Sequence, residues 1–135
     1  MILINKDSSN VRSFTLNELV EGSDPFDFLF SFTNDTTNQT VTFHATDISV
    51  ATERYNQFDI IETTVEDLYN AEVTLSPEGY WSYIVYQMPQ ESPPNLNPDD
   101  AVKILEIGKV LVKGEAPTNA TFTTNDNTNN VVFDN

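Results

Sequence analysis

The sequence predicts an all-β protein, an antiparallel β-sandwich of about seven or eight strands followed by an extended C-terminal arm. Thr and Asn make up 31 of the 135 residues, so most stretches of the chain have poor helix propensity. Aromatic side chains alternate with smaller ones in the middle of the chain, and turn-forming residues separate short apolar runs throughout. Many short strands with turns between them are typical of a sandwich.

The chain opens with two predicted strands. Ile2 to Ile4 forms a short apolar run, and a second strand is expected over residues 11–19. In that second strand Arg12, Phe14 and Leu16 share one face, because side chains two residues apart lie on the same side of a strand.

A hairpin is predicted over residues 26–45. Phe26, Phe28, Phe30 and Phe32 occupy every second position, which indicates a half-buried strand, and residues 40–45 alternate in the same way. The intervening NDTTN segment consists of side chains that bond their own backbone in turns, so the two strands should be antiparallel neighbours.

A further strand is predicted over residues 55–62, where Phe58 and Ile60 alternate with polar residues. The segment from Val65 to Asn70 is either one short helix capped by Thr63 or Thr64, or an irregular loop. The sequence leaves these two alternatives open.

A second hairpin is predicted from residues 72–75, a turn over 76–79, and residues 80–87. Pro77 fixes φ at the first central turn position, and Gly79 accepts a positive φ where the next strand begins. Both faces of the run from Tyr80 to Tyr86 are apolar, which indicates a central strand with Trp81 in the core.

Residues 87–100 hold four of the seven prolines and are expected to form a surface loop. The last strand is predicted over 102–112, with a bulge or a close backbone approach at Gly108. We therefore expect a sandwich over residues 1–113 and an Asn/Thr-rich arm over 114–135. The expected core residues are Phe28, Phe30, Phe43, Phe58, Trp81, Tyr83 and Val110.

The net charge of −15 argues against several classes of partner. Six basic residues against 21 acidic ones cannot form the positive surface that nucleic acid requires.

No apolar run is long enough for a membrane-spanning helix, and no secretory signal is expected at the start. The absence of Cys excludes disulfides, thiolate nucleophiles and zinc–thiolate sites.

The sequence contains few residues typical of active sites, and no catalytic residue or cofactor is predicted. Acidic residues lie close in sequence at Asp24 and Asp27, at Glu66 and Asp67, and at Asp99 and Asp100, but a composition with 21 acidic residues produces such pairs by chance. The single histidine, His44, falls on the polar face of its strand and is expected at a surface or an interface.

Residues 95–106 partly match a calcium-binding loop. Asn95, Asn97, Asp99 and Glu106 match ligand positions of an EF-hand loop, but Asp100 replaces the required glycine and the preceding prolines prevent an entering helix. No metal site is therefore predicted there, although a looser calcium site among the acidic loops stays open.

Five segments of the chain resemble small virion proteins of tailed bacteriophages, particularly crAss-like and related phages of Bacteroidetes hosts. They are PFDFLFSFTND, ERYNQFDI, EVTLSPEGYWSYIVYQM, the loop with NLNP, and LEIGKVLV. The strands at 79–86 (G-x-W-x-Y-x-V-Y) and 106–112 (E-x-G-K-V-x-V) resemble immunoglobulin-like strands of those proteins. The resemblance covers roughly residues 24–113.

The resemblance implies an immunoglobulin-like, non-enzymatic structural protein of the virion, assembled in the host cytoplasm. It would be an auxiliary or decoration protein of the capsid or a head-fibre component, present in several copies and bound to the major capsid protein or to tail or fibre subunits. A tail or baseplate component is one alternative. A carbohydrate-binding adhesion module, assisted by calcium and using exposed Trp81 or tyrosines, is another.

Partner contacts are expected in the proline-rich loop and in the arm. An arm can add a strand to a neighbour's sheet edge, which satisfies main-chain groups and needs few side-chain anchors. The expected contact residues are the few apolar side chains of the arm and two loop prolines: Phe122, Val131, Val132, Phe133, Pro93 and Pro94.

Overall fold

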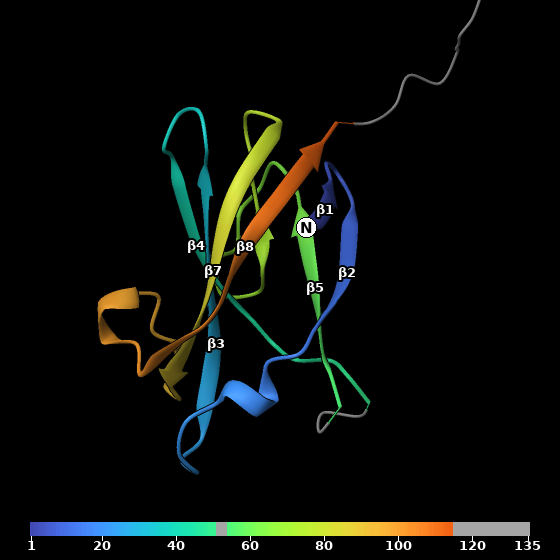
Figure 1. Ribbon diagram of the computed structural model, residues 1–135. Helices are drawn as coiled ribbons and strands as arrows, with labels where there is room; N and C mark the ends of the chain where they lie inside the picture. Colours follow the sequence, from blue (N-terminus) through green and yellow to red (C-terminus); the bar gives the residue numbers. More distant parts are fainter. Residues whose placement is uncertain (51–53, 115–135) are drawn as a thin grey trace, which may run out of the picture.

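The protein is a sandwich of two β-sheets in a computed structural model that describes residues 1–50 and 54–114 (Figure 1). The five-stranded sheet has the order β1-β8-β7-β3-β4, and the three-stranded sheet has the order β2-β5-β6. The strands are β1 (Ile2–Asn5), β2 (Ser9–Phe14), β3 (Phe26–Asn34), β4 (Thr40–Ala45), β5 (Asn56–Glu62), β6 (Glu72–Val73), β7 (Gly79–Pro89) and β8 (Lys103–Lys113). The predicted all-β sandwich is confirmed for the described residues.

Helical structure in the described ranges is limited to two 3₁₀ turns, Asn17–Leu19 and Pro98–Asp100. Among the described residues, no helix is long and apolar enough to cross a membrane. Residues 65–70 form the irregular loop of the two predicted alternatives, because Asp67 accepts hydrogen bonds from the backbone of Tyr69 and the side chain of Asn70 and so closes a turn.

The prediction of wholly antiparallel sheets is wrong at two places. β1 pairs in parallel with β8, and β5 pairs in parallel with β6, while the other strand pairs are antiparallel. The parallel pairs arise because each joins strands separated by a crossover rather than by a hairpin. The chain's first strand thereby completes the sheet beside its last described strand.

The second strand is shorter than predicted. β2 ends at Phe14 instead of continuing to residue 19, because the side chain of Asn56 accepts hydrogen bonds from the backbone N–H groups of Leu16 and Asn17 and turns the chain away. Phe14 and Leu16 nevertheless both enter the core, and Arg12 is half-buried beside them, as the shared face predicted.

The predicted 26–45 hairpin is confirmed, with Phe30 opposite Phe43 in the register of β3 and β4. The expectation that its first strand is buried on one face only is wrong, because Leu29, on the opposite face from the phenylalanines, is 1% exposed. The proline-rich segment folds back over this end of the sheet: the Glu91 N–H donates to Asp27 Oδ2, and the Val102 N–H donates to the Gln87 carbonyl.

The predicted hairpin over residues 72–87 is wrong. β6 belongs to the three-stranded sheet, while β7 lies in the five-stranded sheet between β3 and β8, so the segment between them crosses from one layer to the other. The buried carboxylate of Glu62 directs this crossing by accepting the Leu75 N–H. The expected positive φ at Gly79 is present, at 119°, and β7 is the predicted central strand.

Of the two alternatives predicted at Gly108, a bulge or a close approach, the structure has the close approach there. A Cβ atom at Gly108 would lie 2.5 Å from Tyr83 Cε1, so this position is the predicted close approach. The bulge is separate: Val85 pairs with Glu106 and Tyr86 with Ile104, which leaves Leu105 as the extra residue.

The core lies between the sheets and is built largely from aromatic rings. Phe58 of the three-stranded sheet makes edge contacts with Phe28 and Phe30 of the opposite sheet, at ring-centroid distances of 5.1 and 5.0 Å. Such pairs add about 0.5–1.5 kcal/mol each beyond the area they bury. All seven predicted core residues are buried.

The open side of the sandwich between β1 and β2 is closed by polar side chains. Asn10, 1% exposed, donates to the carbonyls of Asn5 and Ile60 and accepts the Asn5 N–H. Arg12 donates through Nε to the Leu3 carbonyl and through Nη1 to the Val11 carbonyl. These contacts tie the edge strand of one sheet to the edge strand of the other.

Candidate functional site

The outer face of the five-stranded sheet carries an apolar surface over three of its strands, β1, β8 and β7. Register places Ile84 opposite Ile107, Tyr86 opposite Ile104, and Tyr80 opposite Leu111, and all six alternate with residues that point into the core. Ile107 is 67% exposed, Tyr80 55% and Ile104 48%. We call this set, together with Leu3 of β1, the outer apolar face.

The charge of the outer apolar face is unusual for this chain. Between Ile104 and Leu111, and on the β7 positions opposite them, the outward-pointing side chains include one ionised group, that of Lys109. Its Nζ lies 2.7 Å from Asp35 Oδ2, and the hydrogen bonds from Lys109 and Ser82 hold the pKa of Asp35 below its usual value. A protein with 21 acidic residues therefore keeps this face nearly free of negative charge.

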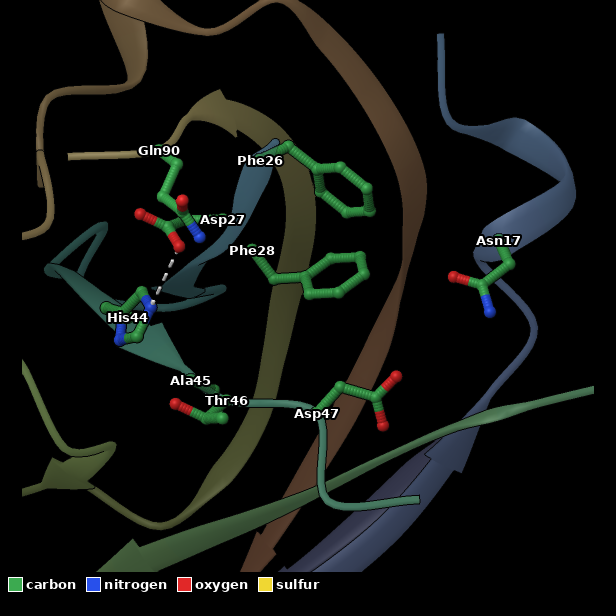
Figure 2. Close-up of a pocket in the computed structure, with 9 residues that line it drawn as sticks. All are labelled: Asn17, Phe26, Asp27, Phe28, His44, Ala45, Thr46, Asp47 and Gln90. Carbon is green, nitrogen blue, oxygen red and sulfur yellow. Dashed lines mark ion pairs between the residues drawn. The ribbon is translucent and has the colours of Figure 1, made fainter. Parts of the chain in front are cut away.

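A second feature is a hollow of about 610 Å³ at the end of the sandwich where β3 begins and β4 ends (Figure 2). Figure 2 shows Asp27 and His44 facing each other at one side of the hollow, with Asn17 and Asp47 at the other. His44 Nε2 lies 3.8 Å from Asp27 Oδ1, and His44 Nδ1 lies 3.1 Å from the Tyr69 carbonyl.

The polar groups of this hollow hold loops in place. Burial would raise the pKa of Asp47, but hydrogen bonds from the backbone N–H groups of Ser49 and Gln57, together with side-chain bonds that include one from Asn56, outweigh burial and lower that pKa. Both carboxylate oxygens of Asp47 are thus already used. Asp27 accepts the Glu91 N–H and faces His44, which is largely buried rather than on an open surface.

The paired acidic residues are not brought together as acid–base pairs. Glu66 accepts the Thr74 N–H, whereas its neighbour Asp67 closes the loop described above. Asp99 and Asp100 lie exposed on the 3₁₀ turn, and Asp100 accepts a hydrogen bond from Asn95. Asp24 is exposed, whereas Asp27 accepts the Glu91 N–H, so these two acidic residues also have different environments.

The EF-hand-like positions are occupied by other bonds. Asn95 Oδ1 accepts the Asn97 N–H and Asn97 Oδ1 accepts the Asp99 N–H, whereas Glu106 lies on β8 and accepts the Tyr83 hydroxyl. Burial and this carboxylate raise the pKa of Tyr83. Within residues 1–50 and 54–114, no group of three or more acidic or histidine side chains is arranged to hold a metal ion.

The predicted contact residues have different environments. Pro93 is exposed, and Pro94 is half-buried beside Asp27 and His44. Phe122 and Val131 to Phe133 lie outside the described residues. Trp81, weighed as a sugar-stacking platform, is 0% exposed and donates its Nε1–H to the Pro77 carbonyl.

Sequence reasoning missed the outer apolar face as a functional surface. The alternation of Ile84 and Tyr86 on one strand was the available signal, but it indicated a strand buried on both sides. Ile104 and Ile107 are three residues apart and share a face only because of the bulge at Leu105. Only the layer arrangement reveals that nothing among the described residues covers Ile107.

Comparison of the chain with known protein families, with curated proteins and with solved structures finds no significant match.

Proposed function

We propose that the protein is a non-enzymatic structural protein of a tailed-phage particle, an auxiliary or decoration protein of the capsid or a head-fibre-associated protein. It binds other virion subunits, and several copies serve in each particle. The virion assignment rests on the resemblance of residues 24–113 to small virion proteins. The binding role rests on the outer apolar face.

The two motifs that carry the resemblance belong to neighbouring strands. The Gly79–Tyr86 and Glu106–Val112 motifs lie on β7 and β8, which pair with each other in the five-stranded sheet. They therefore describe one continuous structural unit whose outward side is the outer apolar face.

An immunoglobulin-like classification is part of the same proposal, and strand order supports it. The order β8-β7-β3-β4 corresponds to strands G, F, C and C′ of a variable-type domain, and the antiparallel pair β2-β5 corresponds to B and E. Three features differ from antibody domains: the buried Trp81 lies on the strand corresponding to F, the chain has no cysteine pair, and β6 pairs in parallel with β5.

The observation that carries the binding role is the outer apolar face. Contiguous apolar surface on a protein that otherwise repels its neighbours marks an interaction site, because uncovered isoleucine side chains are costly in water. Ile107 lies opposite Ile84 and Ile104 lies opposite Tyr86, so each exposed isoleucine has an outward-facing apolar neighbour on β7.

Co-sedimentation of the full chain with purified phage particles or empty capsids tests the proposal. We expect saturable binding at a fixed ratio, and the ratio distinguishes a capsid-lattice position from a vertex or tail position. Ile107→Asp should weaken binding because it places a charge in the apolar contact. Val11→Asp, at a 43% exposed position on the other sheet, is the matched control and should bind normally. A chain that stays in the supernatant at all particle concentrations would refute the proposal.

A further inference from the structure

The outer apolar face has no partner among the described residues, whereas one main-chain group on each of three strand edges is already bonded. On the edge of β1, Arg12 occupies the Leu3 carbonyl, and on the edge of β2 it occupies the Val11 carbonyl. On the edge of β4, the His44 N–H already donates to the Leu68 carbonyl. These bonded groups are not available to an incoming strand, whereas the apolar side chains of the outer face are available for contact.

The C-terminal segment, residues 115–135, has a composition that matches this face. Its large apolar side chains are confined to Phe122 and the run from Val131 to Phe133, and its only ionised side chains are acidic. Three of the chain's four lysines lie on β8, at positions 103, 109 and 113. Of these, Lys109 is paired with Asp35 and Lys103 donates to the Leu19 carbonyl, so the segment matches the face through its apolar anchors rather than through opposite charges.

The length of the segment is sufficient. β8 ends at Lys113, so the segment starts from the end of the strand that carries Ile107. Residues 115–131 can extend about 55 Å, whereas the 11 residues of β8 span about 36 Å. The Val131–Phe133 run can therefore reach past the boundary of its own subunit to the face of an adjacent one.

We propose that the outer apolar face is the docking site for residues 115–135 of a second copy of this chain, with Phe133 and its valine neighbours seated over Ile104 and Ile107. The choice of a second copy rests on the proposed function, since a particle holds copies side by side. Each subunit then gives its segment to one neighbour and receives a segment from another, which is a head-to-tail contact.

Single-cysteine variants of the full chain test this contact, because the natural chain has no cysteine. Asn135→Cys marks the segment without removing an anchor, and Ile107→Cys marks the face. The two variants, distinguishable by a tag on one of them, are mixed and mildly oxidised. We expect mixed disulfide dimers to form at least about tenfold faster than in a mixture of Asn135→Cys with Val11→Cys, because docking raises the local concentration of the two thiols.

A second substitution shows which side chain is responsible. Adding Phe133→Ser to the Asn135→Cys chain should reduce the rate to that of the Val11→Cys mixture, whereas Ala120→Ser in the same segment should leave it unchanged. Because positions 107 and 11 are both exposed and the other changes lie beyond residue 114, none of the substitutions alters the described core.

Two outcomes would overturn the inference: equal rates for the two faces, or a chain with both Ile107→Cys and Asn135→Cys that closes on itself as a monomer. These results are separable from those for the particle. A chain that sediments with particles but forms no preferred mixed dimer refutes only the segment contact. Mixed dimers from a chain that ignores particles would support the contact and refute the virion role.

Discussion

Gly108 is the position at which the structure makes the sharpest demand on residue size, and Gly108→Ala is the change that tests it. The added Cβ would lie 2.5 Å from Tyr83 Cε1 and 2.7 Å from Tyr83 Cζ, well inside the 3.5–4.0 Å at which carbon atoms attract. The ring therefore has to move by about 1 Å. It is held by edge contact with Phe14, at a centroid distance of 6.0 Å, and by the hydroxyl bond to Glu106.

The magnitude follows from two opposing effects. Overpacking of this kind costs about 1–3 kcal/mol. Replacing glycine by alanine within a strand returns about 0.5–1 kcal/mol because the unfolded chain loses freedom. We expect the free energy of unfolding to fall by about 1–2 kcal/mol, and Tm to fall by roughly 5 °C. Urea denaturation followed by Trp81 fluorescence, with a thermal scan, measures both.

Gly114→Ala is the matched control. Its Cβ would come equally close to a neighbour, but that neighbour is the carboxylate end of the flexible Glu78 side chain, which can move away. We expect little change there. The Gly108→Ala cost should also disappear in a Tyr83→Val background, where the ring is absent. A Gly108→Ala protein as stable as the natural one, or an unchanged cost in that background, would refute the reasoning.

Three further changes probe buried polar groups. Asn10→Leu leaves the Asn5 and Ile60 carbonyls without their hydrogen-bond donor and should lower the free energy of unfolding, measured by urea denaturation, by about 2–4 kcal/mol. A decrease below about 1 kcal/mol would contradict the role of Asn10 in tying the sheets together. The lowered pKa of Asp47 means that its stabilising effect is present above the ordinary carboxyl pKa and is lost as pH falls through the folded value, so Asp47→Asn should flatten the acid limb of a stability–pH profile. The raised pKa of Tyr83 stabilises the fold fully below about pH 10 and is lost as pH rises further, so Tyr83→Phe should reduce the alkaline decline; an unaltered decline would argue against it.

The strands could be predicted from sequence because alternation is local. Phe26 to Phe32 and Thr40 to Ala45 show it clearly, and the turn between them contains no competing signal. The partner of each strand could not be predicted in the same way. Pro77 and Gly79 predicted a tight turn between paired strands, whereas the chain bends at Pro77 and crosses to the other sheet. That path depends on the hydrogen bond from the Leu75 N–H to Glu62, a residue outside the turn.

The candidate site was predictable only in part. The sequence indicated that Ile84 and Tyr86 share one side of a strand, but it could not say whether a second layer covers that side. Leu29 is 1% exposed and Ile107 is 67% exposed, although both lie on the outer side of the five-stranded sheet. The path of the proline-rich segment depends on hydrogen bonds such as the one from the Glu91 N–H to Asp27, which join residues far apart in the chain.

The parallel pairing of β1 with β8 has a consequence for synthesis on the ribosome. β1 is synthesised well before β8, its partner, and so has no neighbour in its sheet until residues 103–113 are also free. Until then Ile4, which is fully buried in the finished protein, remains exposed to solvent. Completion of the five-stranded sheet is thus a late event, and a chain released before Lys113 would present an unpaired first strand and an open core to chaperones and proteases.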